Sequence, residues 1–266
     1  MLTPARARRL SPSQLREEIA RGRWTGKTTG LAPGHLQANL AVLPRNLAFD
    51  FLLFCVRNPK PCPLLEVTGT GEALSTQVAG TDLRDAFPRY RIYRDGAVID
   101  EPISVREYWR DDLVAFLLGC SLSFEDALLE VGVPLRHLEA DRALPIYRTE
   151  IACRSAGVFR GNMAVSMRPI PGHLVSRAVQ VSGRFPKAHG TPVHVGDPSA
   201  IGIKDLDDVC FGEPPYMKPG DVPVFTACGV TPQLVAADSG VGFMITHYPE
   251  HMLVCDLRSE ELADGV

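Results

Sequence analysis

The sequence lacks the features that mark a membrane protein or a nucleic-acid-binding protein. No apolar run approaches the roughly 18 residues that span a bilayer, and the longest one, residues 49–56, is interrupted by Asp50. Lysine and arginine (28) do not outnumber aspartate and glutamate (31), so the net charge is −3 and no basic surface is expected. The N-terminus carries arginines without an apolar segment, which argues against a secretory signal. We therefore expect neither a membrane nor a nucleic acid as a partner.

Short metal-binding and catalytic motifs are also missing. The chain contains no Cys-x-x-Cys, no His-Glu-x-x-His, no phosphate-binding Gly-x-x-x-x-Gly-Lys and no Gly-x-Ser-x-Gly. No metal ligands and no cofactor are therefore evident, while an assisting divalent metal stays open. The seven cysteines are odd in number and scattered, which is typical of reduced thiols and leads us to expect a cytoplasmic protein.

What is present is the composition of an ordinary globular protein of 266 residues, 45% hydrophobic and 22% charged. Predicted strands alternate with predicted helices, which favours an α/β fold. We expect two intimately packed α/β subdomains. The larger layered sheet-and-helix unit would take residues 1–145 and 220–266, and a smaller two-layer β-β-α-β unit would take residues 146–219.

Individual elements follow from turn and capping residues. Asp95-Gly96 within residues 90–100 predicts a β-hairpin. Ser104 and Ser123 are expected helix caps, and Thr231 before Pro232 is expected to cap a third helix. Helices are expected over residues 46–58, 104–118, 123–132, 174–185 and 231–239.

The stretch VPVFTACGVTPQL (222–234) is the first candidate for a site. A buried strand is expected to turn directly into a helix at Cys228, and a thiol at a helix N-terminus can have a lowered pKa and act as a nucleophile. Backbone N–H groups from Gly229 through Thr231 to Gln233 would bind a carboxylate or an oxyanion. The alternative is a tight turn in which Cys228 is simply small.

A second stretch, GCSLSFE (119–125), repeats this pattern. Ser121 and Ser123 supply hydroxyl groups for substrate binding, and Glu125 is a candidate general acid or base. Acidic residues are also common in the first turn of a helix because they interact favourably with its dipole, so a purely structural Glu125 is the alternative.

The histidines offer further candidates. His247 and His251 have a His-x-x-x-His spacing, but Pro249 between them argues against a helix and hence against a zinc pair. We expect His247 to be a catalytic base or a substrate contact because it follows a predicted strand. His189, in a loop, is a further candidate for proton transfer, whereas His194 is expected to be structural.

Three arginines lie near the ends of apolar elements: Arg148, Arg168 and Arg184. Arginine is the natural bidentate partner of a carboxylate, so these residues are expected either to bind a small acidic metabolite or to form surface ion pairs. Asn39, in the polar cluster before an apolar run, is another candidate for substrate binding.

The same stretches resemble those of the D-glutamate cyclase family, which is also described as a family of hydro-lyases of bacterial cytoplasm. The resemblance covers about residues 13–257. Its motifs are GHLQANLAVLP, FDFLLFCVRNPKPCPLLEVTG, PRYRIYRDG, WRDDLVAFLLGCSLSFEDAL, VSMRPIP, HGTPVHVGDP, ACGVTPQ and ITHYPEHMLVCDL.

The resemblance implies two α/β subdomains and a lyase activity. A larger mitochondrial relative with an additional domain converts D-glutamate to 5-oxo-D-proline and water, which makes this reaction the expected one. The family pattern departs from this chain at Glu250, where Gly is expected, and at Cys255, where Thr is common.

Other functions stay open. The chain could catalyse another hydro-lyase reaction on an amino or hydroxy acid, bind a small carboxylate without catalysis, or act as a cysteine hydrolase through Cys228. A homodimer is compatible with each of these alternatives.

Overall fold

A computed structural model describes residues 2–76, 78 and 80–263. The β-strands are β1 (His35–Pro44), β2 (Leu64–Val67), β3 (Leu74–Ser75), β4 (Thr81–Asp82), β5 (Tyr90–Arg94), β6 (Ala97–Asp100), β7 (Leu113–Gly119), β8 (Ile146–Ala152), β9 (Asn162–Pro171), β10 (His194–Val195), β11 (Asp221–Ala227), β12 (Met244–His247) and β13 (Leu253–Arg258). The α-helices are α1 (Pro4–Ala7), α2 (Pro12–Ala20), α3 (Arg45–Arg57), α4 (Glu125–Glu130), α5 (Arg136–Glu139), α6 (Val175–Gly183) and α7 (Thr231–Asp238). The 3-10 helices include η2 (Ser121–Phe124) and η4 (Pro186–Ala188).

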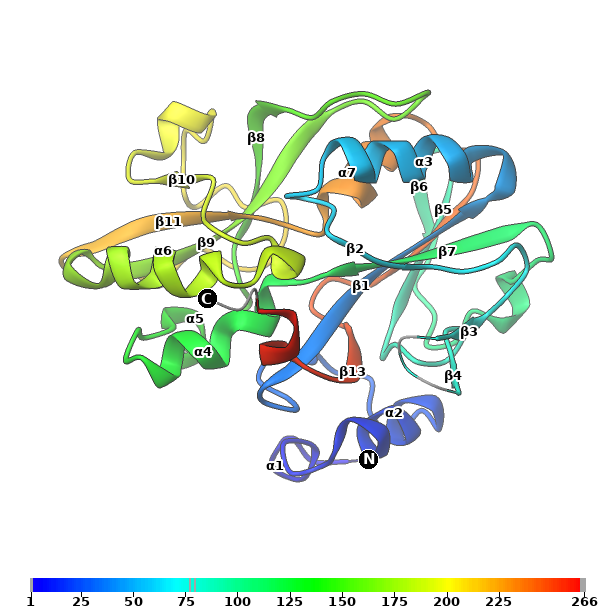
Figure 1. Ribbon diagram of the computed structural model, residues 1–266, viewed down its shortest axis with the longest axis horizontal. Coiled ribbons are helices and arrows are strands. Elements are labelled where there is room, and N and C mark those ends of the chain that lie inside the picture. Colours follow the sequence, from blue (N-terminus) through cyan, green and yellow to red (C-terminus); the bar gives the residue numbers. More distant parts are fainter. Residues whose placement is uncertain (1, 77, 79, 264–266) are drawn as a thin grey trace.

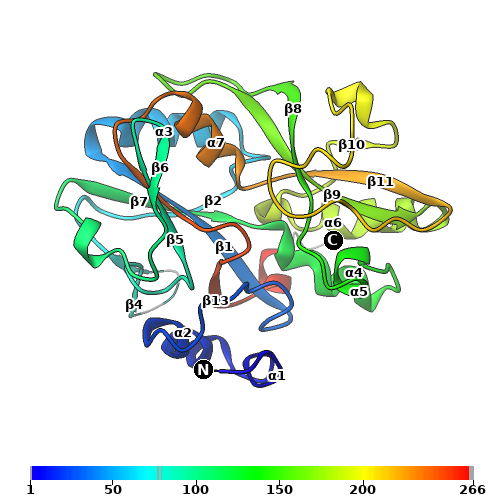
Figure 2. The same ribbon diagram turned by 180° about the vertical axis from the view of Figure 1, so that it is seen from behind.

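The larger sheet is organised around β1, which crosses the middle of the molecule (Figure 1). Its strand order is β2-β7-β1-β12-β5-β6, and β13 also pairs with β1. Every strand pairing in the described residues is antiparallel. Helices α3 and α7 lie on one side of β1, whereas α2 lies on the other side near β13 (Figures 1 and 2).

Both faces of β1 and β7 are buried, which explains their nearly uninterrupted apolar sequences. Leu40 and Val42 of β1 face one core cluster, whereas Ala41 and Leu43 face another that includes residues of α3 and α7. A strand covered on both faces has no polar side to present to water. The predicted helix over residues 104–118 is therefore wrong, because its last six residues, all apolar, form part of β7.

Strands β12 and β13 share one edge of β1 and leave a break between them. β12 pairs with Ala41 and Val42, and β13 pairs with β1 up to Ala38. The connection between them, residues 248–252, leaves the sheet opposite Asn39 and Leu40 and is called the bulge loop here. This break in the strand pairing opens the sheet at its centre.

The second sheet has the order β10-β11-β9-β8 and lies to one side of the first, with α6 packed near it (Figure 1). Its pairing of β9 with β11 is continuous from Asp221 to Ala227. Because β11 begins at Asp221, the boundary at residue 219 leaves a strand of this sheet in the larger subdomain. The α/β class and the presence of separate packed sheets are as the sequence predicted.

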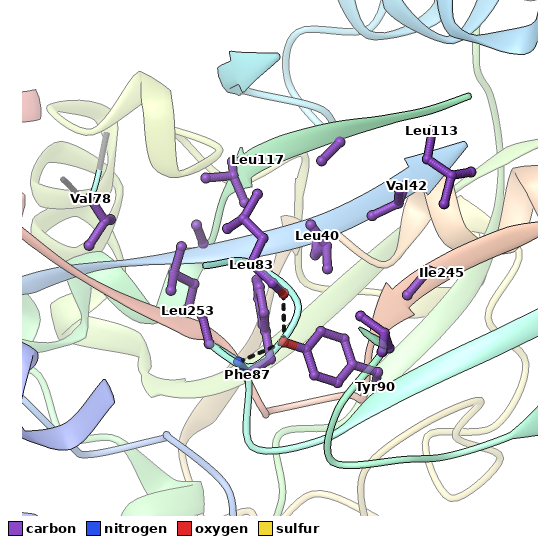
Figure 3. Close-up of a cluster of buried hydrophobic side chains, with 14 of the residues drawn as sticks. Leu40, Val42, Val78, Leu83, Phe87, Tyr90, Leu113, Leu117, Ile245 and Leu253 are labelled. Atoms are coloured by element: carbon purple, nitrogen blue, oxygen red, sulfur yellow. Dashed lines mark hydrogen bonds between the residues drawn. The ribbon is translucent and has the colours of Figure 1, made fainter. Parts of the chain in front are cut away.

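The first core cluster shows how the sheet is sealed on one side (Figure 3). Leu40, Leu117 and Ile245 of the sheet pack against residues of the connection from β4 to β5. The hydroxyl of Tyr90, the first residue of β5, donates a hydrogen bond to the carbonyl of Leu83 in that connection at 2.6 Å and accepts one from the amide of Phe87 at 3.1 Å. The buried hydroxyl of Tyr90 thus has both a hydrogen-bond donor and an acceptor as partners.

Two predicted helix caps are replaced by other contacts. The Ser123 hydroxyl accepts a hydrogen bond from the amide of Gln37 instead of capping a helix. Thr231 is the first residue of α7, not its cap, and its hydroxyl accepts from the amide of Ala164 and donates to the carbonyl of Cys228. Other local expectations are confirmed, including the helix at 46–58, observed as α3, and the hairpin of β5 and β6 around Asp95-Gly96.

None of the described helices combines the length and the apolar character required to cross a membrane.

Leu40→Ala should lower the free energy of unfolding by about 2–5 kcal/mol, because Leu40 is fully buried in the central strand and truncation leaves a cavity. Chemical denaturation followed by circular dichroism measures this loss. Leu129→Ala is the matched control, since Leu129 is 45% exposed on α4 and should cost less than about 0.5 kcal/mol. Equal losses for the two variants would contradict the assigned core.

Candidate functional site

A narrow inner cavity lies where the break in the larger sheet meets the second sheet. It has a volume of about 30 Å³, on the order of the space that a water molecule or a carboxylate group takes. Its walls come from β1, the end of β7, the start of β8, the turn after β11 and the bulge loop. The lining residues are Asn39, Cys120, Ser121, Leu122, Leu144, Ile146, Cys228, Val230, His247, Glu250 and Met252.

A wider outer cleft of about 400 Å³ adjoins this cavity. Leu144, Ile146 and Glu250 line both spaces. The cleft also carries the cationic side chains of Lys27 and Arg91. A small molecule would thus place one end in the inner cavity and the rest in the outer cleft.

His247 ends β12 and turns its ring into the inner cavity because β1 has no strand partner at this point. The amide of Leu40 donates a hydrogen bond to Nδ1 of His247 at 3.1 Å, and Nε2 of Gln233 lies 3.0 Å from the same nitrogen. A nitrogen that accepts these bonds carries no proton, so the ring proton is on Nε2. Burial lowers the pKa of His247 to about 3. His247 is therefore a neutral hydrogen-bond donor to the cavity, not the catalytic base that the sequence suggested.

Asn39 lies on the opposite side of the same break. Its side-chain amide donates to the carbonyl of Gly119 at 2.6 Å, which ties β1 to the end of β7. Gly229 packs directly on this amide, and a Cβ added at Gly229 would overlap the side-chain atoms of Asn39. The glycine of the predicted anion-binding turn is therefore required by close packing, whereas Asn39 itself reaches the cavity.

Behind Ser121 lies a buried charge cluster built on Glu125. Arg168 of β9 donates to Oε1 of Glu125 from Nε at 2.9 Å and from Nη2 at 2.6 Å, and Nη2 also donates to the hydroxyl of Ser121 at 3.1 Å. His137 Nε2 lies 3.2 Å from the same carboxylate oxygen, although it is not aligned for a hydrogen bond. Burial alone would raise the pKa of Glu125, but the neighbouring His137 and Arg168 side chains lower it to about 2.

This cluster changes the predicted roles of Glu125 and Arg168. Glu125 is held as an ionised carboxylate and does not line the inner cavity, so it is a positioning residue and not a proton donor at neutral pH. Arg168 is only 2% exposed and reaches the cavity through the Ser121 hydroxyl. Together they join the end of β7 to the second sheet.

The thiols are not activated. Cys228 and Cys120 both line the inner cavity, but burial raises the pKa of Cys228 to about 11 and that of Cys120 to about 12. The expected lowering at a helix N-terminus is overcome by loss of solvent, because a thiolate is poorly stabilised in apolar surroundings. A nucleophilic Cys228 is therefore contradicted by its environment.

Glu250 of the bulge loop is the residue that the sequence analysis missed. Its Oε1 accepts hydrogen bonds from the Thr29 hydroxyl and the Leu144 amide, both at 3.2 Å. Burial raises the pKa of Glu250. Its backbone φ is +63°, a conformation that favours glycine. The available signal was that the family resemblance predicts Gly at this position, which indicates a backbone conformation that favours glycine.

Other predicted site residues lie away from the inner cavity. Arg148 forms a surface ion pair with Asp238 at 2.6 Å, and Arg184 is exposed at the end of α6. His189 is buried beside the Pro59–Lys60 loop, where its Nδ1 lies 2.8 Å from the carbonyl of Lys60, and burial lowers its pKa to about 4. Ser123 and Thr231 make the backbone contacts described above.

A second hollow has charged side chains that are already paired. This hollow of about 360 Å³ next to α2 includes Arg106, Asp82 and Asp85, but these charges pair with one another. In residues 2–76, 78 and 80–263, no three His, Cys, Asp or Glu side chains are grouped so as to hold a metal ion.

Comparison with known proteins places the chain in a family. The family model for D-glutamate cyclase matches residues 114–256. A "Putative hydro-lyase" from Thermoanaerobacter sp. (strain X514) is 57% identical over 255 residues, 96% of each chain. Proteins of the same name from Stutzerimonas stutzeri and Streptomyces coelicolor are 56% and 53% identical, covering 96% and 94% of this chain and 97% and 90% of theirs. The chain therefore belongs to the D-glutamate cyclase family.

Among solved structures, a nitrogen repressor-like protein from Methanococcus jannaschii is similar over 91% of this chain and 97% of its own. The TM-score is 0.38 with 10% identity, which is too low to support an inference about fold or function.

Arg168→Ala should lower the free energy of unfolding by about 3–5 kcal/mol, because it leaves the buried Glu125 carboxylate without its main partner. Arg148→Ala is the control, since that ion pair is half exposed and should be worth at most about 1 kcal/mol. Urea denaturation of both variants gives the comparison. If Arg168→Ala is no more harmful than Arg148→Ala, the buried cluster does not support the fold as described.

The stability of the protein should depend on the ionisation of Glu125. Its pKa of about 2 in the folded chain lies below the ordinary 4.5, so the ionised group stabilises the fold above pH 4.5, and this contribution is lost as the pH falls toward 2. Between pH 6 and about pH 3, wild-type protein should therefore lose stability faster than Glu125→Gln. Parallel stability profiles, measured by urea denaturation, would show that the carboxylate is not ionised and paired in the native state.

Proposed function

We propose that this protein is a hydro-lyase that acts on a small amino or hydroxy acid, and that its reaction is the cyclisation of D-glutamate to 5-oxo-D-proline with loss of water. Membership of the D-glutamate cyclase family and the names of the relatives support the reaction class. The observation that supports the site is the convergence of His247, Asn39 and Ser121 on one cavity that opens through Glu250.

The reaction needs groups of this kind. In the cyclisation the substrate amine forms a bond to the γ-carboxyl carbon, and one γ-carboxyl oxygen leaves as water. The ammonium nitrogen must lose two protons in all, one before it attacks and one as the lactam forms, and the carboxylate oxygen that leaves as water must gain two. Negative charge develops on the attacked carboxyl group, and fixed hydrogen-bond donors stabilise it.

The inner cavity offers such donors without reorganisation. The Nε2–H of neutral His247 is held by the Leu40 amide on the other side of the ring. The Ser121 hydroxyl accepts a hydrogen bond from Arg168, which orients its own O–H. In our proposal the γ-carboxyl group occupies the inner cavity and the amino-acid end lies toward the outer cleft, where Lys27 attracts the second carboxylate.

Incubation of purified protein with D-glutamate should yield the lactam, observed by proton NMR. L-glutamate and 5-oxo-D-proline are incubated alongside, each with and without a divalent metal ion. His247→Asn, which shortens the donor, should slow formation of the lactam by at least about 100-fold. Arg148→Ala should retain the wild-type rate because Arg148 lies at the surface.

Two results would count against the proposal. Lactam formation that is equally fast with His247→Asn would place the reaction elsewhere or in a contaminant. Folded protein that leaves D-glutamate unchanged under all conditions would exclude the cyclase, and binding without turnover would indicate a carboxylate-binding protein instead.

A further inference from the structure

The bulge loop holds Glu250 in a conformation that its own backbone disfavours. The Tyr248 carbonyl accepts a hydrogen bond from the His251 amide at 2.9 Å, which closes a turn with Glu250 inside it. The φ of +63° at Glu250 is costly for a residue with a Cβ atom. Thr28 fixes this turn from outside, because its amide donates to the Glu250 carbonyl at 2.8 Å. The strained position is thus over-determined by its surroundings, as is common for residues at functional sites.

The carboxylate of Glu250 is only half used by the protein. Oε1 accepts the bonds from Thr29 and Leu144. For Oε2, no partner is present in the described part of the chain, and this oxygen is not among the buried unpaired atoms. One oxygen therefore orients the group, and the other is available to a ligand.

Glu250 also stands at the passage between the two spaces, since it lines both the inner cavity and the outer cleft. Deeper in the cavity, the Ser121 hydroxyl and the Nε2–H of neutral His247 can donate hydrogen bonds to a carboxyl group, whereas the Asn39 amide already donates to the carbonyls of Leu118 and Gly119. Among the side chains that line the inner cavity, Glu250 is the one carboxylate. A ligand that extends from the cavity to the cleft meets this acceptor at its middle.

We propose that Glu250 binds the ammonium group of the substrate and thereby selects amino acids over the corresponding hydroxy acids. This inference rests on the proposed function and refines its substrate class. A carboxylate attracts an ammonium group by charge and by hydrogen bonding, whereas a hydroxyl group offers a single neutral donor.

The test compares ligands that differ only at this group. D- and L-glutamate and D- and L-aspartate are titrated by calorimetry beside the 2-hydroxy acids of the same carbon skeletons. Wild-type protein should bind one amino acid at least tenfold more tightly than its hydroxy analogue. Glu250→Gln should weaken binding of that amino acid about tenfold or more and change binding of the hydroxy acid less than about twofold. The control is Glu107→Gln, because Glu107 is exposed and lines neither the inner cavity nor the outer cleft.

Glu250→Gly provides a variant that should fold better than the wild type. Glycine adopts the positive φ without strain, so the melting temperature should rise by about 2–4 °C, while the preference for the amino acid is lost. If Glu250→Gly is more stable than the wild type but no longer prefers the amino acid, the lost preference comes from the missing carboxylate and not from a damaged fold.

The outcomes distinguish this inference from the proposed function. If Glu250→Gln binds and converts D-glutamate like the wild type, the ammonium site is wrong and the cyclase stands. If binding of an amino acid depends on Glu250 but no lactam forms, the ammonium site stands and the cyclase is wrong. Wild-type protein that binds none of the amino acids, or equal loss of both ligand types in Glu250→Gln, would overturn the ammonium site.

Discussion

The structure depends on one interruption in strand pairing. β1 pairs with β7 without a break from Ala38 to Pro44 on one side, but on the other side it is shared by β12 and β13. The amide of Leu40, which lies between these two partners, is bonded to the ring of His247 instead of to a strand. A buried amide must find an acceptor. Here that requirement fixes a histidine ring, sets its tautomer and directs its remaining N–H into the cavity.

The second sheet closes the cavity that this interruption opens. The turn after β11 brings Cys228 and Val230 to one wall, and the start of β8 brings Leu144 and Ile146 to another. Arg168 links the two sheets by bonding both Glu125 and Ser121. Charge in this region is thus neutralised within the protein, and the groups that face the cavity are neutral donors together with the single carboxyl group of the bulge loop.

Local signals in the sequence predicted those elements whose formation depends on local contacts. The hairpin at Asp95-Gly96 follows from backbone preferences at two residues, and the helix at 46–58 ends where Pro59 stops it. The segment that includes Leu113 to Gly119 was misassigned because a short apolar run buried on both faces looks the same in a helix and in a strand. No local feature reveals that β7 is covered on both sides.

The same distinction applies to the site. Ser121, Cys228 and His247 were recognised because each follows an apolar segment, and strand ends gather at cavities. Asn39 was recognised because it belongs to a polar cluster before an apolar run. The pKa of Cys228 could not be foreseen, since burial depends on distant packing. Glu250 escaped notice because its importance comes from the break between β12 and β13, which is a property of the assembled sheet.

The separate anchoring of β12 and β13 also bears on how relatives can diverge. Each strand has its own register on β1, so residues can be inserted into or deleted from the bulge loop without sliding either strand. Substitutions within the five residues of the bulge loop can then change the size and charge of the inner cavity while the core stays intact. Changes in the bulge loop that alter ligand binding therefore need not reduce the stability of the sheet.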